Sequence, residues 1–299
     1  MTQILTHKIR LDPTCKQENY FRKACGIARF TWNWALSRWE ERYKAGEKVN
    51  AFELKKEFNA LKIIKFSWIY EVTKYASQQP FIYLQRAFNN FFEKKASYPK
   101  YKKKGVHDSF YIGGDQIKIV EKRVKIPNLG WVRLREFLRF EGKIQGVTIS
   151  QSAGNWFISV HVAIAHQPAI CENQAKVGVD LGIKKLATLS DGKTYSNPRP
   201  LKKQQSKLRK LQRQLARRQM GSKNRTKTKR RLAKVHYKIS CVRNDTIHKL
   251  TTDLTNSYGH IVIEDLDVSS FPLKIVPRSS PVEQCSDLSR SPVVVWLSR

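Results

Sequence analysis

The spacing of hydrophobic residues is helical in the first third of the chain. Apolar residues recur every three or four positions over 16–45, 51–61 and 70–95, which predicts three helices. Pro80 falls inside the third range and should begin a new helix or kink that one, because proline lacks a backbone donor. Three tryptophans, at positions 32, 34 and 39, follow the same spacing and are expected in the core rather than stacked on bases. Residues 14–95 are therefore predicted to be all-helical.

The pattern changes to a period of two over residues 108–166, and a similar pattern occupies 4–11. Alternating segments predict an antiparallel meander, with a last hairpin turning at Ala153-Gly154-Asn155. The segments are SFYIGG, QIKIVEKRVKI, WVRLR, LRFEG, IQGVTISQS and NWFISVHVAIA. We expect a small, barrel-like β body that the N-terminal strand joins.

A different kind of strand begins at Lys176, where an apolar run carries one acid, Asp180, near its end. Leu186–Leu189 predicts a second strand, which turns back through a tight hairpin at Asp191-Gly192 to Thr194-Tyr195, because this dipeptide accepts the positive φ angles of such turns. Much later, the run HIVIEDL (260–266) again ends in acid, at Glu264 and Asp265. Continuous apolar strands of this kind are typical of a sheet covered on both faces.

Asp180 and Glu264 are the candidate catalytic and metal-binding residues. An acid at a strand end is commonly a turn-former or a helix cap, and either residue alone is weak evidence. Two carboxylates held by rigid strands, however, suit Mg²⁺-dependent cleavage of phosphodiesters, since hard divalent cations prefer oxygen ligands. The pair therefore predicts a Mg²⁺ site.

Between the two acids lies the most biased segment of the chain. Residues 192–244 contain no Asp or Glu and nineteen Lys and Arg. Leucines at 201, 208, 211 and 215, and apolar residues at 232, 235, 239, 242, 250 and 254, form two seams that predict a helical hairpin bent at Met220-Gly221-Ser222. A merely solvated hairpin would alternate the sign of its charges, whereas here the repulsion between like charges calls for phosphate.

A second basic run, ASYPKYKKKG (96–105), reads either as a solvated linker or as a phosphate contact, and Tyr98 and Tyr101 mildly favour the contact. We expect nucleic acid to bind the cations of this run and of the hairpin. These residues are Lys100, Lys102, Lys103, Lys104, Lys202, Lys203, Lys207, Arg209, Lys210, Arg213, Arg217, Arg218, Lys227, Lys229, Arg230, Arg231 and Lys234.

Composition supports a polyanionic partner. The 299 residues carry a formal charge of +33, with 57 Lys+Arg against 24 Asp+Glu, and nucleic acid is the default partner for such a field. A membrane surface is the competing partner, but no apolar run approaches the length of a spanning helix and the N-terminus lacks a signal-peptide core. Five cysteines without any CxxC pair give no zinc site and no disulfide framework. We expect a cytoplasmic, nucleoid-associated protein with reduced thiols.

With these pieces placed, the chain resembles the TnpB (OrfB-type) proteins of bacterial insertion sequences, which are RNA-guided DNA endonucleases. The resemblance is carried by HKIRLDPTCKQ, WNWAL, YPKYKKK, VTISQSAGNWFISVHV, VGVDLGIKKLATLSDG and IVIEDL, from about residue 4 to Phe271. It implies an α+β multidomain chain: a helical recognition lobe (14–104) inserted in a β-barrel wedge domain (1–13 and 105–172), and then a RuvC-like (RNase H-type) α/β nuclease domain (173–271). Asp180 matches the family's first catalytic Asp and Glu264 its catalytic Glu. The resemblance also implies Mg²⁺, target DNA and a guide RNA from the transposon end.

The C-terminus departs from this resemblance. The family continues with a four-cysteine zinc motif and a third Asp, whereas residues 272–299 contain four prolines, a lone Cys285 and no CxxC. We expect a disordered tail produced by a frameshift or truncation near codon 271, the alternative being a native but divergent tail. The Asp of SDLSRS, residue 287, does not match the third catalytic position, so the RuvC-like domain is expected to be incomplete and to lack zinc ligands.

Three functions follow in order. The first is a transposon-associated RNA-guided DNA endonuclease with little or no double-strand cleavage, because a two-metal site needs more shared carboxylate oxygens than two residues supply. The second is a non-catalytic DNA- and RNA-binding protein derived from it. The third and weakest is a transposase that itself transfers strands.

Overall fold

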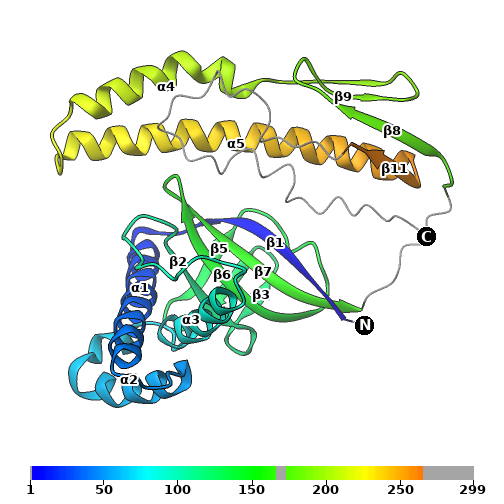
Figure 1. Cartoon of the computed structure of the whole chain (residues 1–299). Helices are drawn as coiled ribbons and strands as arrows, with labels where there is room; N and C mark the ends of the chain where they lie inside the picture. The colour runs from blue at the N-terminus through cyan, green and yellow to red at the C-terminus, as the bar shows by residue number, and fades with distance from the viewer. Residues whose placement is uncertain (1, 166–172, 265–299) are drawn as a thin grey trace. The chain divides into compact units, whose positions relative to one another are not determined.

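The computed structural model describes residues 2–165 and 173–264, and the chain divides into two compact units, 1–167 and 168–299 (Figure 1). Each unit buries its own hydrophobic residues: one large core in the first, and two smaller ones in the second. No helix of the described residues is both long and apolar enough to cross a membrane.

Helices follow the first strand of the first unit: α1 (Cys15–Lys44), α2 (Ala51–Lys65), the short 3-10 helix η1 (Ser67–Glu71) and α3 (Tyr75–Phe92). Thr14 begins α1 with a capping box, in which its hydroxyl accepts from the backbone N–H of Gln17 and the Gln17 side chain accepts from the backbone N–H of Thr14. The third helix starts at Tyr75, later than predicted, because η1 takes up the preceding residues. Pro80 lies within α3, so the helix does not restart there.

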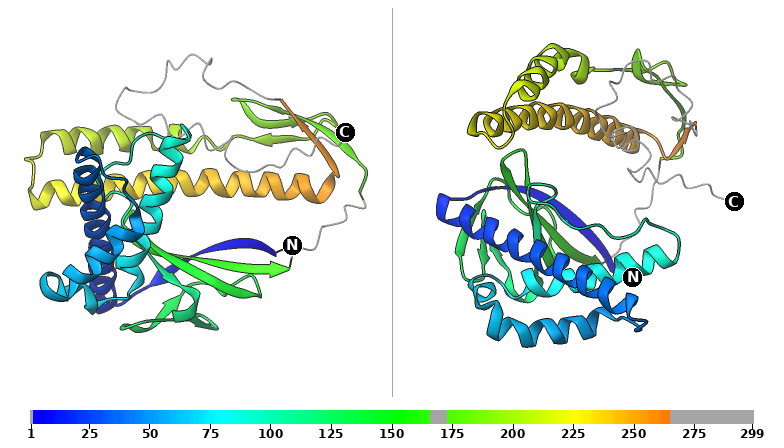
Figure 2. Two further views of the ribbon diagram at one scale, coloured as in Figure 1. Left: turned by 60° about the horizontal axis from the view of Figure 1, so that its bottom comes forward. Right: turned by 60° about the vertical axis from the view of Figure 1, so that its left-hand side comes forward.

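The helical periodicity correctly places the tryptophans in the core. Trp32 and Trp39 are buried and Trp34 is partly buried. The rings of Trp39 and Phe88 stack with their centroids 4.1 Å apart, which ties α1 to α3. Figure 2 shows the helices against the sheet of the same unit, with which they share one core.

The sheet of the first unit has seven strands in the order β2-β6-β7-β1-β5-β4-β3. The strands are β1 (Thr2–Asp12), β2 (Ser109–Gly113), β3 (Lys118–Val120), β4 (Arg123–Ile126), β5 (Gly130–Leu134), β6 (Lys143–Ser152) and β7 (Asn155–Ala165), with a short 3-10 turn η2 (Gly114–Gln116) after β2. The N-terminal strand joins the meander, as predicted, and pairs with β7 through residues 2–10 and with β5 through Leu11 and Asp12.

One detail of the β prediction, closure into a barrel, is not seen among the described residues, and another, a strand at 138–142, is wrong. The sheet is open, since β2 and β3 end the strand order and no pairing among the described residues closes it into a barrel. The segment LRFEG (138–142) forms no strand. Its alternating Leu138 and Phe140 do pack against the core, but the backbone N–H of Arg139 donates to Nδ1 of His7 at 3.3 Å instead of to a neighbouring strand.

The second unit combines a four-stranded sheet with a helical hairpin. The strand order is β10-β9-β8-β11, where β8 (Lys176–Leu181), β9 (Lys185–Leu189) and β10 (Thr194–Ser196) are antiparallel neighbours and β11 (His260–Ile263) runs parallel to β8. Gly192, with φ of 89°, sits in the predicted turn between β9 and β10. Helices α4 (Pro200–Arg217) and α5 (Lys223–Ser257) form the hairpin, which bends where predicted.

One face of this sheet packs on the C-terminal part of α5. Leu250 and Leu254 contact the inward residues Val177, Val179 and Leu189. On the opposite face Val262 is 67% exposed, and no described element covers it. The sheet is therefore covered on one face among the described residues, where covering of both faces was expected.

The rest of the hairpin has its own narrow core. Leu208 and Leu211 of α4 meet Val235 and Ile239 of α5 as the seams predicted, whereas Leu201 at the start of α4 is exposed. Figure 1 shows α4 lying along α5.

Candidate nuclease site and nucleic-acid interface

The parallel pairing of β8 and β11 brings the two predicted acids together. The register matches Val177 to Ile261 and Val179 to Ile263, so the next residue of each strand, Asp180 and Glu264, falls side by side. Neighbouring strands lie about 4.8 Å apart, so the two acids leave adjacent backbone positions. The site thus joins residues 84 positions apart in sequence.

Both acids point away from the core, because side chains alternate along a strand. Val179 and Ile263, which precede them, pack against Leu250 and Leu254, so Asp180 and Glu264 face the opposite, open side. Both are exposed, and among the described residues neither has a hydrogen bond or an ion pair. Thr188 of β9 is the register partner of Asp180 on its other side.

The donor chemistry fits a single Mg²⁺ ion. This ion is commonly held by one or two carboxylates, with water and substrate phosphate completing its shell. Within residues 2–165 and 173–264, no cluster of three or more His, Cys, Asp and Glu could hold a metal ion.

The basic hairpin presents most of its predicted cations to solvent. Of its thirteen predicted residues, all but Arg218 are exposed. Over 192–244 there is no acidic side chain to neutralise them locally. This surface is suited to a polyanion.

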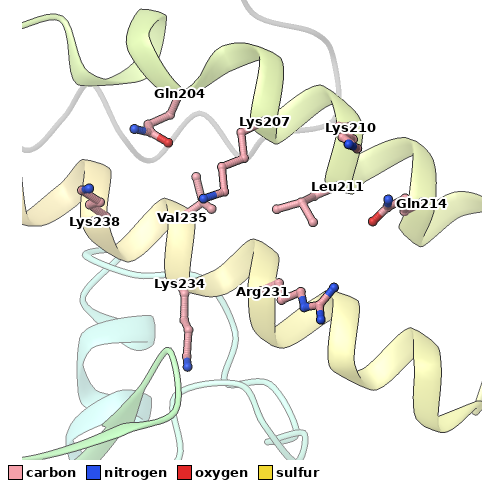
Figure 3. Close-up of a pocket in the computed structure, with 9 residues that line it drawn as sticks. All are labelled: Gln204, Lys207, Lys210, Leu211, Gln214, Arg231, Lys234, Val235 and Lys238. Atoms are coloured by element: carbon pink, nitrogen blue, oxygen red, sulfur yellow. The ribbon is translucent and has the colours of Figure 1, made fainter.

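A groove of about 660 Å³ runs between α4 and α5. Its cationic walls come from both helices, and Figure 3 shows Lys207 reaching from α4 toward Val235 of α5, with Leu211 between the helices. The lining residues are Gln204, Lys207, Lys210, Leu211, Gln214, Arg231, Lys234, Val235 and Lys238. Lys238 was missed by the sequence prediction, although it lies one helical turn after Lys234.

Arg218 has a structural position at the turn of the hairpin. Its guanidinium donates to the backbone carbonyl of Asn224 and to the hydroxyl of Thr228. Arg225, from the other helix, donates to the carbonyls of Leu215 at 2.6 Å and of Arg218 at 2.8 Å. Arg225 therefore satisfies carbonyls that the end of α4 leaves without intrahelical partners, while Arg218 bonds the first turns of α5.

The basic linker is held against α1. The indole N–H of Trp32 donates to the carbonyl of Lys100 at 3.1 Å, and Asn33 bonds both the N–H and the carbonyl of Lys102 at 2.8 and 3.0 Å. The Lys102 ammonium lies 4.2 Å from the centre of the Trp32 ring, and desolvation lowers the pKa of this lysine.

The tyrosines of this linker are engaged as well. The phenols of Tyr98 and Tyr101 both donate to the Glu40 carboxylate, and the Tyr98 ring packs edge-on against Phe88 and Phe91. These contacts orient the linker, and they leave the side chains of Lys103 and Lys104 exposed.

Similarity to known proteins covers both units. A family model described as a probable transposase of the OrfB, IS605 type matches residues 159–272, and one described as a helix-turn-helix domain matches residues 1–48. In the structure the latter range holds β1 and the single helix α1.

Among curated proteins, the Escherichia coli K12 protein described as "putative RNA-guided DNA endonuclease InsQ" is 36% identical over 276 residues, which are 90% of this chain and 68% of that protein. A Streptomyces pristinaespiralis protein with the same general description is 32% identical over 87% of this chain and 66% of its own length. A solved Cas12f1–sgRNA–target DNA complex aligns with a TM-score of 0.48 and 12% identity, over 93% of this chain and 85% of that one.

The pair of strand-end carboxylates and the cationic hairpin are features of a nucleic-acid-processing protein. The chain belongs to the TnpB/OrfB (IS605) family, and the two relatives named above are each described as a "putative RNA-guided DNA endonuclease". It spans about two thirds of the length of the two relatives named above.

Proposed function

We propose that this chain is an RNA-guided DNA-binding protein of the TnpB type that cuts DNA weakly at a site formed by Asp180 and Glu264. The observation that carries the proposal is the parallel register of β8 and β11, which sets the two acids side by side on one open face. We assign the second unit as the RuvC-like nuclease domain, on the support of this pair and of the family to which the chain belongs.

Mg²⁺, when bound, would neutralise charge on the scissile phosphate and favour ionisation of an attacking water. Asp180 and Glu264 supply its oxygen ligands from rigid strands, which keeps their spacing fixed. The cations of α4 and α5 hold the phosphate backbone, and the guide RNA supplies sequence choice, as implied by the family.

The weakness of cleavage rests on the size of the ligand set. Clamping both the attacking and the leaving oxygen takes two ions with shared ligands, and the proposed site has the carboxylates of Asp180 and Glu264 alone. The same observation favours the second candidate, a binding protein without catalysis.

A plasmid assay tests the proposal. The full chain is incubated with Mg²⁺, RNA transcribed from the transposon end and a supercoiled target plasmid, and nicked and linear products are quantified. We expect slow nicking, little linear product, and loss of nicking in Asp180→Asn and Glu264→Gln with RNA and DNA binding unchanged. Asp245→Asn, an exposed acid of α5 paired with Lys249, is the matched control.

Each candidate has its own result. Rapid linearisation abolished by Asp180→Asn would show that the site is complete and that the predicted weakness is wrong. Binding with no Mg²⁺-dependent nicking would select the non-catalytic candidate. Joining of transposon ends to the plasmid would select the transposase.

A further inference from the structure

The strands β3, β4 and β5 form one antiparallel end of the seven-stranded sheet, with two very different faces. The inward side chains, Val124, Ile126, Val132 and Leu134, are buried in the core of the first unit. The outward side chains are mainly basic and include one aromatic ring: Lys118, Val120, Arg123, Lys125, Trp131 and Arg133. We name these six residues the β3–β5 outer face.

The register arranges this face in two rows. Lys118 pairs with Lys125, which pairs with Trp131, so one row runs across all three strands. Directly opposite residues have Cβ atoms about 4.5–5.5 Å apart, and like charges at that spacing destabilise a sheet. The face therefore carries a repulsion that a bound polyanion would relieve.

The second row repeats the pattern. Val120 pairs with Arg123 and Arg123 with Arg133, so two arginines also lie directly opposite each other. Asp12 lies beside Arg133 in the register and pairs with Arg135 at 3.4 Å, so it offsets charge only at the Arg133 end of this row, and Glu121 belongs to the β3–β4 turn. Within the described residues, no carboxylate lies within ion-pair distance of the four cations of the face.

Trp131 exposes an aromatic ring on this basic surface. Its side chain is 43% exposed, and its carbonyl accepts from the Gln17 side chain at 2.9 Å, which anchors the strand to α1. Exposed aromatic rings beside cations on a rigid sheet suit a single-stranded nucleic acid, because an unpaired base stacks on the ring while its phosphates meet the cations. A duplex keeps its base faces inside the helix and cannot use the ring.

We propose that the β3–β5 outer face binds a single-stranded segment of nucleic acid, with one base stacked on Trp131 and adjacent phosphates on Lys125, Arg123 and Arg133. This site belongs to the first unit, whereas the hairpin groove and the carboxylate pair belong to the second. It builds on the proposed function only in that the chain binds nucleic acid, and it requires no cleavage.

Photocrosslinking tests this site directly. A 12-nucleotide single strand with one 5-iodouracil, made as RNA and as DNA, is irradiated with the full chain and digested with trypsin. We expect the label on the peptide 126–133, IPNLGWVR, which contains Trp131 and no other aromatic residue. The strand type that labels it more strongly identifies the natural source of the segment.

Substitutions on this face test its contribution to the affinity for a single strand. Trp131→Ala should remove this crosslink and weaken single-strand binding about 5- to 150-fold, the range for one stacked base, whereas Trp131→Phe should retain most of the affinity. Arg123→Gln with Lys125→Gln should lower the salt slope by about 1.4, at about 0.7 per phosphate on a single strand. Trp68→Ala is the matched control, since its ring is 42% exposed but packs on Phe30 and Phe66.

Crosslinks confined to other peptides, or unchanged single-strand affinity in Trp131→Ala, would overturn the proposal. The result is separable from the hairpin's role, because hairpin variants alter duplex binding while leaving the 126–133 crosslink in place. Loss of the crosslink in a hairpin variant as well would place the strand on α4 and α5 and would also overturn it.

Discussion

The hairpin groove offers a quantitative test of the electrostatic interface. Lys207 and Lys210 from α4 and Arg231 and Lys234 from α5 line it, and all four are exposed. Replacing the four with glutamine removes four positive charges and leaves the apolar contact of Leu211 with Val235 intact.

The size of the effect follows from counterion release. Each phosphate neutralised on duplex DNA contributes about 0.9 to the slope of log K against log salt, so four contacts contribute about 3.6. At ~0.15 M salt this slope corresponds to about a thousandfold loss of affinity, as an upper limit. The hairpin itself should fold as well as before, because each pair spaced three residues apart loses a repulsion.

Fluorescence anisotropy with a 20-base-pair duplex, measured across a salt series, gives both the affinity and the slope. A matched quadruple variant, Lys44, Lys48, Lys56 and Lys65 to glutamine, removes the same charge from exposed positions of the helical region. It should reduce the slope much less, which separates contact at the groove from the net charge of the protein.

Equal slopes for the two quadruple variants would refute the assignment of the groove as a contact site. So would a fall in affinity accompanied by loss of helical circular dichroism, because the four charges would then be needed for folding rather than for binding.

Three further predictions concern the structure. Gly114→Ala should destabilise the first unit by about 1–3 kcal/mol, because the added Cβ would lie 2.0 Å from the backbone oxygen of Ile144. Gly26→Ala is the control: its Cβ would meet nothing nearer than 3.9 Å, so the free energy of unfolding should stay unchanged or rise. Urea unfolding compares the two variants. Arg225→Ala should destabilise the hairpin turn by about 1–3 kcal/mol, since two carbonyls lose their donor, and hydrogen exchange at the turn should rise. Burial raises the pKa of the Cys25 thiol from 9.0 to about 12, so alkylation at pH 9 followed by mass spectrometry should label exposed Cys15 and spare Cys25. The stability linked to that protonated thiol should be present below pH 9.0 and lost as the pH rises toward about 12.

Local patterns were sufficient for most of the elements. Helical spacing predicted α1 and the helical hairpin. Asp191-Gly192 located the turn between β9 and β10, and Met220-Gly221-Ser222 located the turn between α4 and α5. These features depend on residues close in sequence. The approach of Asp180 to Glu264 was also predictable, since each acid follows an apolar strand whose length sets where the side chain emerges.

The sequence did not predict which individual cations make contacts within the protein. Arg218 and Lys102 look like any other members of their basic runs, but the structure commits Arg218 to the hairpin turn and holds Lys102 over Trp32. The partners of Arg218 come from the neighbouring helix α5, and Trp32 lies 70 residues from Lys102. The spacing of residues in the sequence does not predict such contacts. LRFEG illustrates the same limit, because His7 takes the N–H that a strand neighbour would have bonded.

The sequence by itself determined the periods, the charge and the two acids, because these are properties of neighbouring residues. Only the tertiary structure decided which strands lie beside one another, and hence that Lys118, Lys125 and Trp131 from three separate strands form one row. The physical reason is that strand register depends on the burial of side chains across the whole sheet, which brings together residues that no local pattern connects.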